Sequence, residues 1–342
     1  MNMKPTIKDV ARLANVSITT VSNVLNGNFN NMSEETRRRV EKVIEELNYY
    51  PSVGARSLSR KGKTQSICIV IPHNMDYIFN HRYFAGVMKG IAEVVEMNGY
   101  RTLLLATRDK RKSEINYLKG LKSGIVDGFL LFDINQNDPY VEEFLSSNIP
   151  FMVVGQYKEG DGNYVDIDVV NGSYQAVHHL IEHGYRKIFL IAGPKTMVFT
   201  QQIVKGYKKA LHEFGMKYSS KNVFYGPFSV KHGYEAGQKI LQMLESRSAV
   251  FSTSEQATLG LSQLLNEKGL AFPDDVGIIS FGENRSLGTL SEILTSIKQP
   301  EYEIGKKVME KLINMIKTNT YVTTAEILPV KLDVRKSCGC NK

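Results

Sequence analysis

Two groups of side chains have the residue types and the spacing to bind a metal ion. His178, His179 and His183 lie close together in a segment with helical periodicity, and Cys338 and Cys340 flank a glycine near the C-terminus. Imidazoles and thiolates are ligands for zinc, and thiols also respond to oxidants. No cysteine or acidic cluster adjoins the histidines in the sequence, however, and chain termini are commonly mobile. We therefore expect ordinary helix histidines, a cysteine tail without a function, and no metal or other cofactor.

Catalytic chemistry is not evident in the sequence. No nucleophile has a recognisable base and orienting partner, and no Gly-rich phosphate loop opens a helix after the first expected strand. We therefore expect that the protein is not an enzyme.

The net charge of +8 is concentrated near the N-terminus. Residues 1–63 contain 11 Lys or Arg and 6 Asp or Glu, which gives this region +5. A basic region on a nearly balanced body suggests a polyanionic partner, although a solubilising surface would have the same charge. Three cysteines imply no disulfide framework, and neither a secretion signal nor an apolar run of about 18 residues is present. These features favour the cytoplasm.

Two short helices are expected at the start of the basic region. Thr6 caps a first helix that ends near Leu13, and Ser17 caps a second that ends at Asn26-Gly27. Asn15-Val16 makes the tight connection between them. Such a pair is a helix-turn-helix.

A third helix completes this head. Ser33 caps it, and its apolar stripe gives the pair a core to pack on. Pro51 closes the head, and residues 53–60 have helical spacing but too little apolar surface to be stable alone, which indicates a hinge that folds on contact.

From Gln65 onward, β-rich apolar runs alternate with amphipathic helices. The expected strands are 67–71, 102–106, 128–132 and 151–154, then 187–192, 222–225, 249–252 and 276–281. The expected helices are 84–98, 112–122, 139–147, 171–183, 201–214, 231–245 and 256–268. Such alternation requires parallel sheets, and ligands then bind beyond the carboxyl ends of the strands. The predicted fold is an all-α helix-turn-helix head plus an α/β body of two doubly wound parallel-sheet lobes.

The head carries a dense motif that resembles the LacI/GalR family of bacterial transcriptional regulators. The matching residues are Thr6-Ile7-Lys8-Asp9-Val10-Ala11, Val16-Ser17, Thr20-Val21-Ser22, Leu25-Asn26-Gly27, Thr36-Arg37, Leu47-Asn48-Tyr49 and Pro51. The likeness continues through His179-Leu180-Ile181, Ala192-Gly193-Pro194, Gly206-Tyr207 and Pro273-Asp274-Asp275-Val276, so it covers essentially the whole chain. It implies a homodimer with a periplasmic-binding-protein-like body, whose effector alters the relation of the two heads.

The resemblance also implies roles for residues of the second helix. Base reading in the major groove falls to Ile18, Thr19 and Asn23, and contacts to the DNA backbone fall to Ser17, Thr20, Ser22 and Asn26. Asn23 favours adenine through a bidentate amide, and Ile18 suits a thymine methyl group. A solvent-facing or phosphate-binding role for Asn23 is the alternative.

In the family, hinge helices enter the minor groove, and Ala55 and Leu58 occupy the positions that do so. Arg56, Arg60, Lys61 and Lys63 would meet phosphates and make binding sensitive to salt. Gly54 stands where a helix former is usual and costs about 1 kcal/mol against Ala, which weakens the hinge. Leu58 could instead pack on the body.

The effector cleft departs from that of the sugar-responsive members. Gly155, Ile203, Ser254-Glu255 and Gly282 replace charged or amide residues common in the family, so a standard hexose contact set is not expected. The candidate effector residues are Asn74, Tyr77, Tyr83, Phe84, Gln156, Phe199, Gln202, Phe228, Ser254, Glu255 and Glu283. Aromatics with amides suit a sugar bound differently, a modified sugar or a nucleobase.

The sequence thus predicts a head over 1–51, a hinge over 52–64, and an effector-binding and dimerisation body over 65–342. The first lobe is expected at about 65–163 plus 297–325, and the second at about 164–296 plus 326–342. The predicted function is that of a DNA-binding transcriptional repressor that binds a pseudopalindromic operator as a homodimer and responds to a ligand in the cleft between the lobes. The alternatives are a regulator controlled by a protein partner, an activator, and a solute-binding protein.

Overall fold

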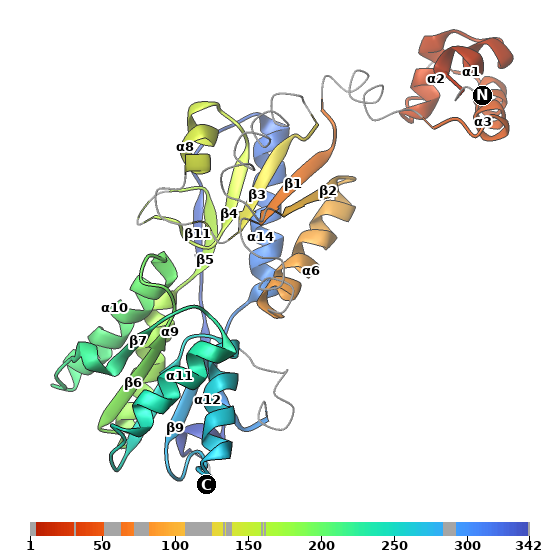
Figure 1. Ribbon diagram of the computed structural model, residues 1–342. Helices are drawn as coiled ribbons and strands as arrows, with labels where there is room; N and C mark the ends of the chain where they lie inside the picture. The colour runs from red at the N-terminus through yellow and green to blue at the C-terminus, as the bar shows by residue number, and fades with distance from the viewer. Residues whose placement is uncertain are drawn as a thin grey trace. The chain divides into compact units, whose positions relative to one another are not determined.

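The computed structural model describes residues 5–30, 32–50, 63–71, 82–106, 125–132, 134, 139–158, 160, 162–282 and 292–340. The chain divides into two compact units, and each is described by itself (Figure 1). One unit contains the N-terminal residues as far as Ser66, together with 117–127. The other contains the remaining residues and both β-sheets. The expected hinge helix over 53–60 and the expected helix over 112–122 lie outside the described residues.

The head consists of the three predicted helices α1 (Ile7–Leu13), α2 (Ile18–Leu25) and α3 (Glu34–Glu46). Ser17 and Ser33 cap α2 and α3, since each hydroxyl accepts a hydrogen bond from the backbone N–H three residues later. Asn15 turns the chain between α1 and α2 in the left-handed region, which Asn tolerates. The core joins all three helices through buried Val10, Val21, Val24, Val40 and Val43.

The first sheet has the strand order β11-β5-β4-β3-β1-β2. Its strands are β1 (Ser66–Ile71), β2 (Arg101–Ala106), β3 (Gly128–Phe132), β4 (Phe151–Val154), β5 (Tyr164–Ile167) and β11 (Ala325–Leu328). The pairs from β1 through β3, β4 and β5 to β11 are parallel. We call this sheet, with the helices α6 (Arg82–Met97), α8 (Pro139–Ser146) and α14 (Glu301–Thr318), the first lobe.

The second sheet has the order β12-β10-β9-β8-β6-β7. Its strands are β6 (Lys187–Ala192), β7 (Val223–Tyr225), β8 (Ser248–Ser252), β9 (Gly277–Phe281), β10 (Thr295–Lys298) and β12 (Lys331–Asp333). All described pairs are parallel except the one between β10 and the edge strand β12. This sheet forms the second lobe with α9 (Val169–Glu182), α10 (Val198–Glu213), α11 (Val230–Leu241) and α12 (Glu255–Glu267).

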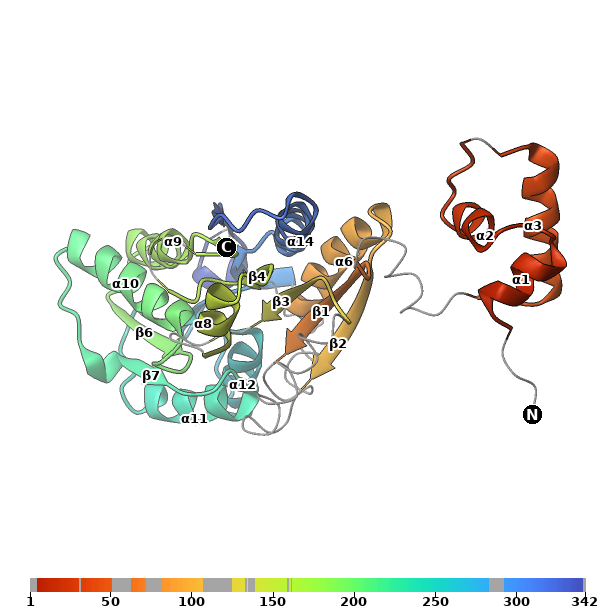
Figure 2. The same cartoon turned by 90° about the horizontal axis from the view of Figure 1, so that it is seen from above.

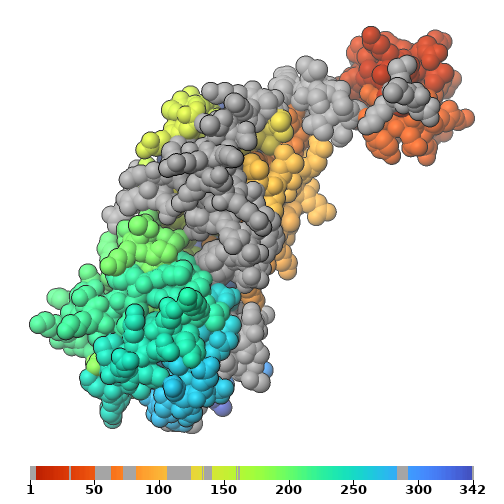
Figure 3. Space-filling model, viewed as in Figure 1, coloured from red at the N-terminus to blue at the C-terminus, as the bar shows by residue number. Residues whose placement is uncertain are grey.

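Helices cover both faces of the second sheet, with α9 and α10 on one face and α11 and α12 on the other (Figure 2). In the space-filling view, α10, α11 and α12 form a continuous outer surface of this lobe (Figure 3, green to cyan). In the first lobe α6 packs on α14, where a Cβ atom on Gly305 would lie 2.0 Å from the carbonyl oxygen of Val87. Glycine is therefore required for the close approach of these two helices.

The chain crosses between the lobes three times, after β5, after β10 and after β11. The first part of the first lobe was expected to end at about residue 163. It extends through β5, because β5 still pairs with β4 and β11 in the first sheet. The boundaries expected at 297 and 325 shift in the same direction, since β10 belongs to the second sheet as far as Lys298 and β11 to the first as far as Leu328. Among the helices of the described residues, none is long and apolar enough to cross a membrane.

Candidate nucleic-acid interface and ligand pocket

One face of α2 consists of the residues predicted to touch DNA. Positions 18, 19, 22, 23 and 26 share this face at helical spacing, while Val21 and Val24 are buried on the opposite one. Ile18 is 45% exposed, which is unusual for a side chain that has a core beside it to pack into. Thr19 is also exposed, and Asn23 is half-buried. The face is therefore available to a partner.

The side chains on and beside this face differ in their hydrogen bonding. The Ser17 hydroxyl caps α2 and lies 2.9 Å from the Thr20 hydroxyl, and the Asn26 amide donates to the carbonyl oxygen of Ser22. Thr19 and Asn23, in contrast, use their side chains in no hydrogen bond with another described residue. Base reading requires side chains that are free to bond with DNA, whereas a hydroxyl that contacts the DNA backbone can share its proton. The roles of the individual residues stay predictions.

Helix α2 differs from α3 in its charge. Helix α2 has no charged residue, whereas the acids and bases of α3 pair along the helix, as in the 2.7 Å contact between Arg37 and Glu41. The Arg37 guanidinium also stacks 4.0 Å over the Phe29 ring. Arg39 donates a hydrogen bond to the carbonyl oxygen of Ala14 and so ties α3 to the turn before α2. Arg39 therefore adds a polar contact to the apolar core that joins α2 and α3.

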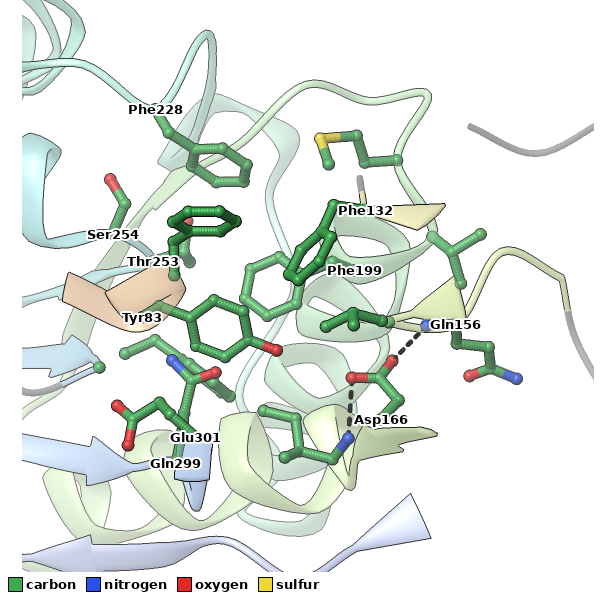
Figure 4. A pocket seen from close by; sticks show the side chains of 18 of the residues that line it. Tyr83, Phe132, Gln156, Asp166, Phe199, Phe228, Thr253, Ser254, Gln299 and Glu301 are labelled. Atoms are coloured by element: carbon green, nitrogen blue, oxygen red, sulfur yellow. Dashed lines mark hydrogen bonds between the residues drawn. The ribbon is translucent and has the colours of Figure 1, made fainter. Parts of the chain in front are cut away.

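A pocket lies between the two lobes at the carboxyl ends of six parallel strands (Figure 4). Its cavity is about 220 Å³, enough for a small ligand. The strands β3, β4 and β5 contribute from the first lobe, and β8, β9 and β10 from the second. This is the position at which ligands bind in doubly wound sheets, as expected from the strand-helix alternation.

Aromatic rings from both lobes wall the pocket. Phe199, at the start of α10, meets Phe281 edge-on at 5.3 Å and Phe228 at 6.0 Å between ring centroids. From the first lobe, Phe84 packs on Phe132 at 5.2 Å. A ligand with an apolar or flat face is suited to such walls.

The carboxylate of Asp166, at the end of β5, is the most buried acid of the pocket, with 6% of the residue exposed. Its two oxygens accept hydrogen bonds from the backbone N–H groups of Gln156, at 2.7 Å, and Ile167, at 2.8 Å. Burial raises the pKa of Asp166 to about 6, and the two N–H donors limit the rise. Figure 4 shows the Tyr83 hydroxyl directed toward this carboxylate, and burial together with the charges of Asp166 and Glu301 raises the pKa of Tyr83.

Gln156 is held by a chain of polar groups. Its side-chain N–H₂ donates to the Tyr164 hydroxyl at 3.1 Å, and its side-chain oxygen accepts from Gln202. Gln202 therefore lies behind Gln156 and is not among the residues that line the pocket. We predicted that Gln202 contacts an effector directly. In the structure Gln202 instead bonds with Gln156 and can orient its side chain.

The other described candidates line the pocket: Tyr83, Phe84, Gln156, Phe199, Phe228, Ser254 and Glu255. Asn74, Tyr77 and Glu283 lie outside the described residues, as do Ala55 and Leu58 of the hinge and the basic Arg56, Arg60 and Lys61. Sequence reasoning missed Asp166, Gln299 and Glu301, all of which line the pocket. Asp166 lies in a strand that was not predicted, directly before a chain crossing, so no local pattern in the sequence marked it.

Gly155 and Gly282 stand where the resemblance led us to note missing carboxylates. Gly155 follows β4 and Gly282 follows β9, and both have a φ of +95°, which disfavours any side chain. Asp166 reaches the N–H group of Gln156 from the neighbouring strand and so supplies a carboxylate next to Gly155.

The C-terminal cysteines are not a separate tail. The side chains of His179, Cys338 and Cys340 meet in the second lobe, with their ligand atoms close enough to share a metal ion. The expectation that no cysteine completes a group with the helix histidines is therefore wrong, because residues 159 and 161 positions apart in the chain are brought together by the fold.

Comparison with known proteins assigns both parts of the chain. Residues 6–52 match the family described as bacterial regulatory proteins, lacI family, and residues 64–336 match periplasmic binding proteins and sugar binding domain of LacI family.

The relatives are similar over nearly the whole chain. The HTH-type transcriptional regulator CelR of Thermobifida fusca is 31% identical over 339 residues, covering 98% of each chain. The HTH-type transcriptional repressor PurR of Actinobacillus pleuropneumoniae serotype 3 is 33% identical, covering 91% of each. The solved structure of a transcriptional regulator CelR-cellobiose complex is 30% identical, with a TM-score of 0.74 and coverage of 97% of this chain and 99% of that one.

Proposed function

Because the chain belongs to the LacI family and is a DNA-binding transcriptional regulator with a sugar-binding-like body, we propose that it represses transcription from a pseudopalindromic operator. Two copies bind the operator as a homodimer, and a small ligand in the pocket between the lobes controls them. The heads of such a dimer read two half-sites related by a twofold axis.

The observation that carries the DNA-binding proposal is the exposed face of α2. Ile18 at its N-terminal end presents a methyl-rich surface, and Asn23 presents an amide that no other described residue uses. An amide of this kind forms two hydrogen bonds with adenine, and an isoleucine suits the methyl group of thymine. The backbone N–H groups at the start of α2 are suited to hold a phosphate beside them.

The experiment is a competition binding assay with the full-length protein, using an operator selected from random duplexes. Asn23→Ala is expected to lose discrimination at one base pair of each half-site, by roughly 1–3 kcal/mol per contact, when all four bases are compared there. Thr36→Ala is the control, because the Thr36 hydroxyl bonds with the Ser33 hydroxyl at the start of α3. Full discrimination by Asn23→Ala would refute base reading by this residue.

The hinge contact remains part of the proposal. By resemblance to the family, we propose that Ala55 and Leu58 enter the minor groove and that the positive charge of Lys63, which follows the hinge in the sequence, strengthens binding to phosphates. Leu58→Ala is expected to weaken specific binding while leaving binding to random duplexes unchanged. Equal weakening of both would show that Leu58 packs elsewhere.

The lining of the pocket supports a neutral or amino-bearing sugar as the ligand. Asp166, Glu255 and Glu301 line it, whereas none of its described lining residues is Lys, Arg or His. Carboxylates accept hydrogen bonds from hydroxyl and amino groups and repel anions, and aromatic walls suit the apolar face of a sugar ring. The relative whose solved complex contains cellobiose is consistent with this class.

A thermal-shift screen tests the ligand class. Neutral sugars, including cellobiose, and amino sugars are expected to raise the melting temperature, because a ligand at 100 times its Kd adds about 2.7 kcal/mol of stability. Sugar acids and sugar phosphates are expected to have no effect. Asp166→Asn should reduce the shift, whereas Glu267→Gln, on the exposed surface of α12, should not. Stabilisation by anionic sugars or nucleobases alone would refute this ligand class, and no stabilisation by any compound would favour a protein co-regulator.

A further inference from the structure

Three metal-binding side chains converge in the second lobe, at the end of the lobe remote from the pocket. The Nε2 atom of His179 lies 3.2 Å from the Sγ atom of Cys338 and 3.2 Å from that of Cys340. The two sulfur atoms are also 3.2 Å apart. The three ligand atoms thus form a nearly equilateral triangle built from the last turn of α9 and the C-terminal turn of the chain.

The fold holds the C-terminal turn in place. Ser337 donates a hydrogen bond to the carbonyl oxygen of Ile278 in β9 and accepts one from the backbone N–H of Thr295 in β10. Cys338 follows in the short helix η3 (Lys336–Cys338) and is fully buried. The turn that carries the two cysteines is therefore anchored to β9 and β10 of the second sheet.

Gly339 lets both sulfurs face the histidine. Its φ of +83° lies in the left-handed region, so the chain reverses between Cys338 and Cys340. A side chain there would also approach the Tyr185 hydroxyl at 3.3 Å. The Thr295 hydroxyl donates a hydrogen bond to the Cys338 sulfur at 3.1 Å, the kind of outer contact that orients a metal ligand.

We propose that His179, Cys338 and Cys340 bind a zinc ion. Two thiolates and one imidazole suit zinc or another soft transition metal, and the absence of a carboxylate from this triad argues against Ca²⁺ and Mg²⁺. Tetrahedral zinc holds sulfur and nitrogen ligands at about 2.0–2.3 Å, which places the ligands about 3.5–3.8 Å from one another. The triangle needs to widen by only a few tenths of an ångström, and a water molecule can complete the tetrahedron.

The metal joins two segments that lie far apart in the sequence. It bonds α9, whose residues pack on β9, β10 and β12, to the turn that follows β12. Metal binding therefore adds to the stability of the second lobe, since the unfolded chain does not hold the three ligands together. Zinc binding at this site does not depend on the proposed regulatory function.

The test uses the full-length protein, freed of metal by a chelator and kept reduced by a phosphine. Zn²⁺ is titrated against a chromophoric chelator, and Co²⁺ is used as a spectroscopic probe. We expect one ion per chain, a thiolate-to-cobalt charge-transfer band and a higher melting temperature with Zn²⁺. Cys340→Ser and His179→Gln are expected to weaken binding roughly 100-fold or more and to abolish the cobalt band.

Matched controls come from the same residue types. Cys68→Ala removes the third cysteine, which lies in β1 of the first lobe, and His178→Gln removes the neighbouring histidine, which pairs with Glu182 at 3.2 Å. Both are expected to bind Zn²⁺ as the unchanged protein does. Circular dichroism checks that each variant folds. Cys340 is suited to substitution because it is only half-buried. Failure to bind one Zn²⁺, or binding that survives in folded Cys340→Ser and His179→Gln, would overturn the proposal.

Discussion

The buried carboxylate of Asp166 predicts a measurable dependence of stability on pH. Its pKa is raised from the ordinary value of 3.8 to about 6 by burial in the pocket. The folded chain therefore binds a proton more readily than the unfolded chain between these two values. Stability must then fall as the pH rises through this window, because folding keeps a proton that the unfolded chain releases.

The size of the effect follows from the shift. Each unit of pKa difference corresponds to 1.36 kcal/mol, so the loss between about pH 4 and pH 6 is on the order of 3 kcal/mol. The contribution is complete below pH 4 and is lost above about pH 6, where Asp166 is ionised in both states. The hydrogen bonds from the N–H groups of Gln156 and Ile167 lower the pKa of Asp166, and the value of about 6 already includes their effect.

Comparison with Asp166→Asn isolates this contribution. Asparagine stays neutral at every pH. Its amide N–H₂ cannot accept the hydrogen bond from a backbone N–H, so the variant loses some stability, but this loss does not change with pH. Urea unfolding followed by far-ultraviolet circular dichroism suits a chain without Trp. The free energy of unfolding of the unchanged protein should fall relative to the variant from pH 4 to pH 6.5 and then level off. A difference that stays flat across this range would refute the assignment of a raised pKa to Asp166.

Three further predictions concern named side chains. Ser17→Ala removes the cap that accepts from the Thr20 N–H, and it should cost the head about 1 kcal/mol, seen as a lower melting temperature of the head. Ile18→Ser changes an exposed side chain, so it should leave stability within about 0.5 kcal/mol while weakening operator binding in a gel-shift assay. Gly305→Ala places a Cβ atom 2.0 Å from the Val87 carbonyl oxygen. It should destabilise the first lobe by more than about 1 kcal/mol in urea unfolding. An unchanged stability would mean that α6 and α14 can move apart without cost.

The head was predictable because its signals are local. Thr6, Ser17 and Ser33 each precede a short apolar repeat, and capping needs only residues three positions apart. The first four strands of each lobe were predictable for a similar reason, since each is built around a short apolar run. Family likeness assigned Asn23 to base reading, and the periodicity of α2 places it on the same face as Ile18 and Thr19, but its contact with DNA stays a prediction.

The remaining elements depend on distant partners. Strand β11 alternates between exposed and half-buried residues, and β12 has only three residues, so neither has an apolar run to find. Asp166 lies in β5, which contains a single charged residue between buried neighbours and whose place is fixed by pairing with β4 and β11. The contact of His179 with Cys338 and Cys340 likewise depends on the tertiary fold, because no local pattern brings together residues so far apart in the chain.

The position of the pocket relates ligand binding directly to the crossings between the lobes. Asp166 and Ile167 immediately precede the crossing into α9, Gln299 lies on the crossing from β10 into α14, and Glu301 begins that helix. A ligand that contacts these residues touches both lobes and two of the three connections between them. Such a ligand shifts the arrangement of the lobes by no more than the difference in its affinity for the two arrangements. We expect residues on the crossings to change that difference most. Gln299→Ala should therefore alter the response to ligand more than Phe228→Ala, a substitution on the pocket wall, when the two variants lose the same ligand affinity.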